Sequence, residues 1–204
     1  MTPMKKLLTA SSLLAVAGLV ACGGGGGGSS PAPTPTATGL AYTDPNPTSG
    51  TFLLKKDTTL SSGSHLVLDL VGPATGTASG VTLTLNADTT KVAWTNVAAT
   101  DPANTLVQNG LQFVLGSGTP ILLARTYGTT TLMATVAQKG LAVTPASLNG
   151  VLLKVALDLK PNLGLAQGTT IQLSADSTKS LVLDGTKGTP IGPITVSVGT
   201  LTAQ

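Results

Sequence analysis

The sequence is short of several residue types, and each shortage excludes a class of structure or site. Its single cysteine among 204 residues excludes a disulfide framework and a zinc site made of thiolates. Charged residues make up 9% of the chain and aromatic residues 2%. The sequence has no glutamate, so all eight acidic residues are aspartate. We expect neither a catalytic acid pair nor a long row of aromatic side chains from such a composition.

The net charge gives no argument for nucleic acid as a partner. The formal net charge is +3, but Lys5 and Lys6 lie in an N-terminal leader. Of the eleven basic residues, nine remain without these two, against eight acidic residues. These nine form no basic run, and clustered Lys or Arg is what steers a protein to a polyanion. We therefore expect no nucleic-acid partner.

Threonine, glycine, leucine and valine dominate the rest of the chain, and this composition favours strands. Thr, Val and Gly are weak helix formers, whereas alternating apolar and polar residues are typical of half-buried strands. Alternation of this kind, bounded by Gly and Pro, occurs at residues 64–71, 81–85, 151–160 and 194–198. About nine short strands predict an all-β fold, a single two-sheet sandwich over residues 39–204.

Two further local predictions accompany this fold class. Residues 111–115 alternate well enough to predict a further strand, and the best helix candidate is one turn at residues 146–149.

At the N-terminus a positive region, an apolar run and a cysteine follow one another. A short positive region at Lys5 and Lys6 precedes an apolar run at residues 7–20. This run of about 14 residues is too short to span a bilayer, which takes about 20. The residues Leu19-Val20-Ala21-Cys22 resemble the lipobox of a bacterial lipoprotein signal peptide. The resemblance implies that residues 1–21 are removed and that Cys22 carries the lipid, and two or more acyl chains anchor a protein stably in a membrane.

Residues 22–38 are expected to form a disordered linker between the lipid and the domain. Six glycines and two serines follow Cys22, and three prolines then stiffen the chain toward polyproline II. The glycines do not predict a nucleotide-binding loop, because no strand precedes them and no helix follows. Gly23 rather than aspartate follows Cys22, which in lipoproteins of bacteria with two membranes resembles export to the outer membrane. We therefore expect a lipid-anchored protein of the cell envelope, at the outer membrane.

Several segments, taken in order, resemble the cohesin pattern. Residues 81–97 (VTLTLNADTTKVAWTNV) resemble its alternating strand, Asp-containing turn and following strand, and residues 149–160 its late central strand. Residues 168–173 (GTTIQL) and 197–202 resemble its last strands. The resemblance covers most of residues 51–204. It implies a nine-stranded jelly-roll β-sandwich, the fold that cohesins share with carbohydrate-binding modules of the cellulose-binding type.

The resemblance also implies a function, although fold analogy alone does not choose between its two forms. One is a non-catalytic scaffolding module that docks a dockerin-like or other envelope protein. The other is a carbohydrate-binding module that grips a polysaccharide. A third alternative is a structural component of the envelope or matrix with no discrete ligand.

Few side chains in the sequence are suited to catalysis or to metal binding. On one strand His65 and Asp69 lie about 13 Å apart, too far to hydrogen-bond, so we expect His65 to be a surface or edge residue. Alternating acids of a calcium loop are absent, although a loose site made by Asp176 and Asp184 stays an alternative. The sequence therefore predicts no enzyme activity, no cofactor and no metal site. The remaining aspartates mostly occupy turn sequences and are expected to be turn formers: Asp44, Asp57, Asp88, Asp101 and Asp184.

The predicted ligand-binding residues are Trp94 and Tyr127, because sugar rings stack on aromatic side chains; Tyr42 is a further candidate. Trp94 lies within a predicted strand, where burial in the core is expected. Tyr127 precedes Gly128 in a predicted hairpin turn, where exposure is expected. Since aromatic residues are few, the sequence favours a protein partner over a polysaccharide.

Overall fold

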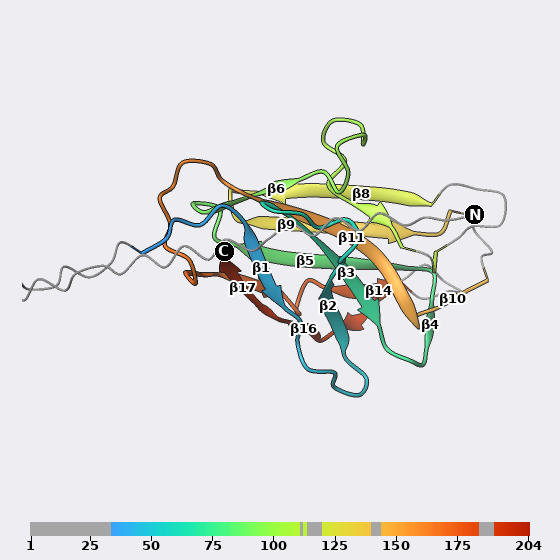
Figure 1. Ribbon diagram of the computed structural model, residues 1–204. Helices are drawn as coiled ribbons and strands as arrows, with labels where there is room; N and C mark the ends of the chain where they lie inside the picture. Colours follow the sequence, from blue (N-terminus) through green and yellow to red (C-terminus); the bar gives the residue numbers. More distant parts are fainter. Residues whose placement is uncertain (1–33, 111, 114–119, 140–143, 184–189) are drawn as a thin grey trace, which may run out of the picture. The chain divides into compact units, whose positions relative to one another are not determined.

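The computed structural model describes residues 34–110, 112–113, 120–139, 144–183 and 190–204 (Figure 1). Within these ranges the chain forms strands and turns and no helix. None of the described residues therefore belongs to a helix that is long and apolar enough to cross a membrane. Cys22 and the leader lie outside the described residues, as does most of the strand predicted at residues 111–115.

The first large sheet has the order β16-β2-β3-β11-β6, and β7 also pairs with β11. Neighbouring strands are antiparallel except for β16 and β2, which are parallel. The long strands β3 and β11 form its centre, and β6 and β7 pair with successive parts of the same edge of β11. The strands are β2 (Phe52–Lys56), β3 (His65–Gly72), β6 (Val92–Thr95), β7 (Gln108–Asn109), β11 (Gly150–Leu159) and β16 (Val196–Val198).

The second large sheet has the order β15-β14-β5-β9-β8, and β13 also pairs with β5. All its pairs are antiparallel, and β8 lies at one edge with β9 as its partner. The strands are β5 (Gly80–Ala87), β8 (Ile121–Tyr127), β9 (Thr131–Ala137), β13 (Leu173–Ala175), β14 (Leu181–Leu183) and β15 (Pro190–Pro193).

Two small sheets complete the described part of the domain. In the first, β17 (Thr200–Ala203) lies between β1 (Leu40–Thr43) and β12 (Thr170–Ile171). In the second, β10 (Ala146–Ser147) pairs with β4 (Thr77–Ala78).

The core lies between the two large sheets, as alternation in the sequence predicts. The inward side chains of β3 and β5 are at most 1% exposed and belong to one cluster. Because every second residue of each strand points inward, the two apolar faces pack against each other as the layers of a sandwich. The inward residues are Leu66, Leu68 and Leu70 of β3 and Val81, Leu83 and Leu85 of β5.

The central strand β11 departs from the strict alternation that the sequence predicts. Its pairing with β3 shifts between Val151 and Leu153, and this irregularity turns Leu152 into the core, where it is fully buried. Strict alternation along residues 151–160 would turn Val151 inward with Leu153 and Val155, but Val151 is only half-buried. An extra residue on one strand of a pair changes which face the following residues occupy.

The outer face of the first sheet is also more buried than the sequence predicts. Alternation along residues 64–71 places Val67 on the face opposite Leu66 and Leu68, yet it is fully buried with Val97 and Ala156 in a second, small cluster. Val97 belongs to the loop of residues 96–107 between β6 and β7, and this loop folds back over the outer face.

The helical turn expected at residues 146–149 is a wrong prediction. Ala146 and Ser147 pair with Ala78 and Thr77 as strand β10, and Asn149 forms an isolated bridge with Gly72. A single turn fixes several dihedral angles for one hydrogen bond, so pairing with an available strand is the more favourable arrangement.

The folded part of the chain begins before the boundary at residue 39 that the composition suggests. The amide of Ala37 donates to the carbonyl of Leu165, and the amide of Thr38 donates to that of Gln204. Thr36 forms a bridge with Ala166. These backbone bonds tie residues 36–38 to the domain, although the sequence places them at the end of the predicted linker, directly after its prolines.

Candidate functional site

The outward face of β8 carries a strip of exposed side chains. Alternation along the strand places Ile121, Leu123, Arg125 and Tyr127 on one face, and we call these four residues the β8 strip. Leu123 is 62% exposed, Tyr127 44% and Ile121 39%. Exposed apolar side chains that gather on one strand differ from the scattered ones found on any surface.

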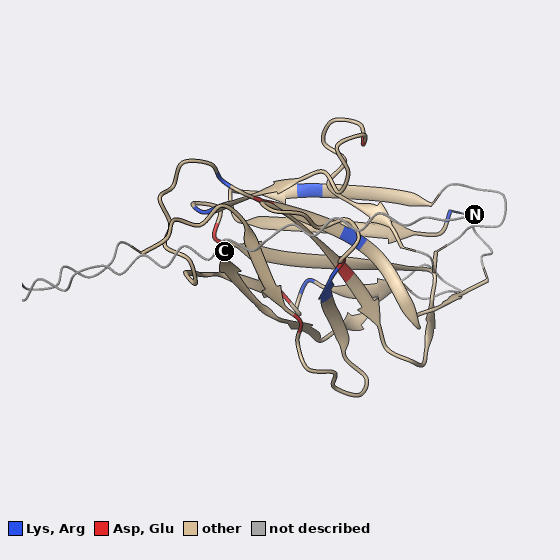
Figure 2. Ribbon diagram, viewed as in Figure 1, with Lys and Arg blue, Asp and Glu red and all other residues tan. Residues whose placement is uncertain are grey.

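The strand next to the β8 strip is uncharged. Opposite it, the outward residues of β9 are Thr131, Met133, Thr135 and Ala137. Arg125 is the one charged residue of β8 and β9, and Figure 2 shows β8 with a single cationic segment. Its guanidinium lies 5.0 Å from the centre of the Tyr127 ring, a cation–π distance. The strip therefore offers apolar contact area and one cation held in place by a neighbouring ring.

Trp94 is half-buried and joins the two sheets. It lies opposite the fully buried Leu157 and packs against the main core. Its indole Nε1 donates to the carbonyl of Thr130, in the turn between β8 and β9, at 3.2 Å. The indole thereby links the edge of the first sheet to a hairpin of the second.

The two predicted ligand-binding residues do not share a surface. Trp94 and Thr126 line the same shallow depression, and Tyr127 follows Thr126, so its ring points to the opposite face of β8. Tyr127 is exposed, as predicted. The pair does not form the flat aromatic row on which a polysaccharide chain would stack.

Tyr42, the further aromatic candidate, is buried and unable to stack on a ligand. Its hydroxyl donates to the carbonyl of Leu54 at 2.8 Å and accepts from the amide of Gly199 at 2.6 Å. Burial raises the pKa of Tyr42 to about 12, although the hydrogen bond from the Gly199 amide acts in the opposite direction. These two hydrogen bonds link β1 to β2 and to the turn before β17.

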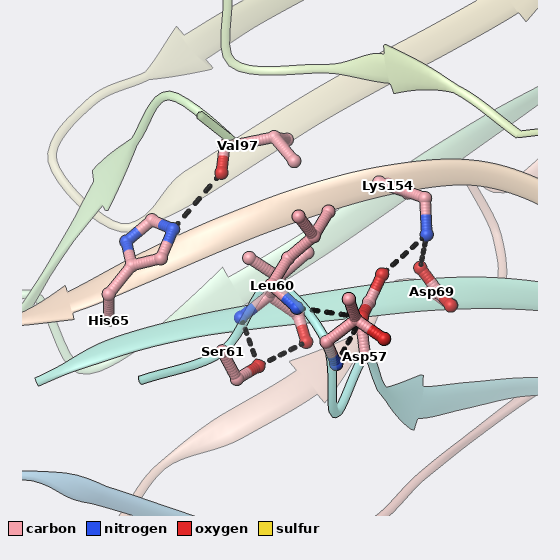
Figure 3. Close-up of polar contacts among 9 residues, drawn as sticks. Asp57, Leu60, Ser61, His65, Asp69, Val97 and Lys154 are labelled. Atoms are coloured by element: carbon pink, nitrogen blue, oxygen red, sulfur yellow. Dashed lines mark hydrogen bonds and ion pairs between the residues drawn. The ribbon is translucent and has the colours of Figure 1, made fainter. Parts of the chain in front are cut away.

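His65 is paired with an acid that the sequence did not suggest. Its Nδ1 lies 2.6 Å from Oδ1 of Asp158, on the neighbouring strand β11, and its Nε2 lies 3.1 Å from the carbonyl oxygen of Val97 (Figure 3 shows the second contact). A catalytic triad needs a nucleophilic hydroxyl at Nε2, and here a backbone carbonyl occupies that place. The pair is therefore arranged to hold a loop, not to activate a nucleophile.

A cation between two carboxylates lies further along the same outer face. Lys154 Nζ is 2.6 Å from Asp57 Oδ2 and 2.7 Å from Asp69 Oδ1 (Figure 3). The three side chains are 20%, 10% and 14% exposed. The group ties the turn after β2 to the centre of the sheet.

The pKa shifts of this group follow from burial opposed by pairing. Burial raises the pKa of Asp69, and its bond to Lys154 offsets this only in part. For Asp57 burial acts in the same direction, but the bonds from Lys154, Leu60 and Thr59 outweigh it and lower the pKa. Burial alone would lower the pKa of Lys154, and the two carboxylates raise it above its usual value.

Of the predicted turn formers, Asp57, Asp88 and Asp101 accept local turn bonds, as predicted. The carboxylate of Asp44 instead accepts from the amide of Lys56, twelve residues along the chain, and Asp184 lies outside the described residues. Asp57 Oδ1 accepts from the amides of Thr59 and Leu60, and Asp101 Oδ2 accepts from the amide of Ala98. The carboxylate of Asp88 accepts hydrogen bonds from Lys91 and Thr90. These bonds, that from Lys91 foremost, lower the pKa of Asp88 to about 2. These bonds satisfy the turns locally.

The loose site of Asp176 and Asp184 lies partly outside the described residues, since Asp184 is not among them. The carboxylate of Asp176 bonds Thr178 and Lys179, which lowers its pKa. No group of three or more acidic, His or Cys side chains within the described ranges could hold a metal ion.

Comparison with known proteins finds similarity in structure and not in sequence. No family model and no curated protein sequence matches the chain. A type II cohesin domain from the cellulosome of Acetivibrio cellulolyticus has a TM-score of 0.55 at 15% identity, over 76% of this chain and 95% of that one. The sixth cohesin of scaffoldin B from the same organism, solved with a Cel5 dockerin, has a TM-score of 0.47 at 20% identity, over 74% and 96%. The chain therefore has an all-β, cohesin-like sandwich fold.

Proposed function

We propose that the domain is a non-catalytic binding module that docks a protein partner of the dockerin type through the β8 strip. The carrying observation is the exposure of Leu123, Ile121 and Tyr127 together on one strand of a cohesin-like sandwich. The class of partner is the one that the cohesin resemblance of the sequence implies. We further propose that a lipid on Cys22 tethers this module to the outer membrane.

The chemistry of the β8 strip specifies what the partner presents. Apolar side chains that become buried at the centre of an interface contribute most of its binding energy. A carboxylate beside them would pair with Arg125, which Tyr127 already orients. Because the strip is part of a hydrogen-bonded sheet, docking orders few groups that were not ordered before. The expected partner therefore has an apolar ridge with an acidic residue next to it.

Leu123→Asp is expected to weaken partner binding at least about 30-fold, the loss typical of an interface hot spot. A photo-crosslinker at position 123 of the full-length protein on intact cells would first capture the partner. Titration calorimetry with that purified partner then measures the affinity. The folded domain should keep its stability, because the Leu123 side chain is largely exposed.

Leu163→Asp is the matched control, since Leu163 is 41% exposed in the loop after β11, where it lines a different depression with Thr38 and Ser64. It should leave the affinity unchanged, and a crosslinker at position 163 should not give the same adduct. Equal loss with both variants would contradict the proposal. So would polysaccharide binding on a glycan array that Tyr127→Ala abolishes and Leu123→Asp leaves intact, because that result assigns the module to a glycan.

Cys22→Ser is expected to release the protein from the membrane, because no thiol remains to take the lipid. Fractionation of cells and labelling with radioactive palmitate measure the two effects. As a control, Gly23→Asp should keep the label while moving the protein to the inner-membrane fraction. Membrane association of Cys22→Ser at the level of the unchanged protein would refute the tether.

A further inference from the structure

One histidine holds the loop of residues 96–107 against the outer face of the first sheet. The loop leaves the edge of β11 after β6 and returns to it at β7. Val97 at its start is 1% exposed and packs on Val67 and Ala156. The carbonyl of Val97 is bonded by Nε2 of His65, whose Nδ1 bonds Asp158. His65 is therefore the polar link between the loop and the sheet at this point (Figure 3).

Both partners of the imidazole are hydrogen-bond acceptors. A carboxylate accepts at one ring nitrogen and a backbone carbonyl accepts at the other. A neutral imidazole has one N–H and can donate to one of them, whereas the imidazolium ion donates to both. Loss of a proton leaves a lone pair facing an acceptor. The charged carboxylate of Asp158 is the stronger acceptor, so the bond to Val97 is the one that breaks.

We propose that residues 96–107 form a pH-controlled flap, docked while His65 carries two ring protons and released when it loses one. Histidine is the side chain that ordinarily changes charge between about pH 5 and 8, and the sequence has one. Release uncovers the apolar contact of Val97 with Val67 and Ala156. It also removes one wall of an open depression of about 580 Å³, which His65, Asp158, Asn96 and Asn104 help to line.

Apart from Asp158, no charged group near His65 in the described part of the chain bonds to its imidazole ring. The short strand β6 brings no charged side chain. Each of the remaining groups either has its own partner or makes no ion pair among the described residues. They are Asp69 of the same strand and Asp57 of the preceding turn, both paired with Lys154 of β11; Asp101 of the loop, bonded by Ala98 and Gln108; and Lys160, two residues after Asp158.

The test follows the backbone amides of the full chain by NMR between about pH 5 and 8. The ring signal of the single histidine gives its titration directly. Amides of residues 96–107 should shift in one step that coincides with this titration. Their hydrogen exchange, corrected for its intrinsic pH dependence, should be about tenfold faster on the alkaline side, as expected for loss of one charge-assisted bond. Amides of the turn at residues 176–180 should show no such step.

Two variants separate the flap from a general effect of pH. His65→Gln retains an N–H donor that does not titrate, so the loop should stay docked with flat pH dependence. His65→Ala lacks the donor, so exchange should be fast across the whole range. Loop amides that do not follow the histidine signal, or a pH step that persists in His65→Gln, would overturn the proposal.

Discussion

Replacing Lys154 with methionine is expected to lower the free energy of unfolding of the domain by about 3 kcal/mol at neutral pH. Methionine keeps much of the length of the side chain and removes its charge. Asp57 and Asp69, which are 10% and 14% exposed, then face each other without a cation. Removing one partner of a buried ion pair leaves an uncompensated charge, and two such charges repel. Urea unfolding at constant pH measures the loss.

The loss of stability in Lys154→Met is expected to depend on pH. In the unchanged protein the pKa of Lys154 is raised, so the stability that Lys154 contributes is fully present below its unfolded pKa. This stability is lost as the pH rises through the higher folded pKa. The lowered pKa of Asp57 contributes stability above its unfolded pKa, which is lost as the pH falls through the folded value. Without Lys154, protonation of Asp57 or Asp69 removes the repulsion between the two carboxylates and so stabilises the folded state of the variant. The difference between the two proteins should therefore narrow as the pH falls from about 5 to about 3.

Two further variants check this interpretation. Adding Asp69→Asn to Lys154→Met should recover part of the loss, because one of the two facing charges is gone. Lys179→Met should cost far less than Lys154→Met, since that lysine is 68% exposed in its pair with Asp176 and exposed ion pairs contribute little to stability. A cost for Lys154→Met as small as that for Lys179→Met would show that the buried group does not stabilise the fold.

The fold was predictable because its main signal is local. Alternation in β3 and β5 identifies Leu66, Leu68, Val81 and Leu83 as core without knowledge of which strands pair, and the structure buries all four. The bulge near Leu152 was not predictable, because an apolar residue at each of two successive positions fits either face. Sequence alternation therefore locates strands better than it locates irregularities within them.

The polar contacts of the candidate sites depend on register, which the sequence does not contain. His65 and Asp158 are 93 residues apart and meet because β3 and β11 pair in one particular register. The outward position of Asp158 was predictable, but its partner was not. The edge position of β8 is likewise a property of sheet order. The sequence shows that residues 121, 123 and 127 are apolar or aromatic, but it does not show whether other parts of the chain cover them.

Gly199→Ala is expected to cost at least about 3 kcal/mol, the sum of forced backbone movement and a broken buried hydrogen bond. A Cβ at position 199 would lie 1.9 Å from the carbonyl oxygen of Thr43 and 2.9 Å from Cζ of Tyr42. Both contacts are shorter than real Cβ atoms tolerate, and the first is to backbone. Strand β1 must therefore move, and the bond from the Gly199 amide to the Tyr42 hydroxyl is lost with it.

Gly192→Ala is the matched control, because a Cβ there would meet no neighbour within 4 Å among the described residues; its effect on urea unfolding should stay within about 0.5 kcal/mol. Tyr42→Phe removes the hydroxyl without a clash and should cost an intermediate amount, about 1–2 kcal/mol. It should also abolish a loss of stability between about pH 10 and 12. That loss follows because the folded pKa of Tyr42 lies above the unfolded value, so its contribution disappears as the pH rises from the unfolded to the folded pKa. Equal costs for the two glycine variants would mean that β1 is not clamped at Gly199.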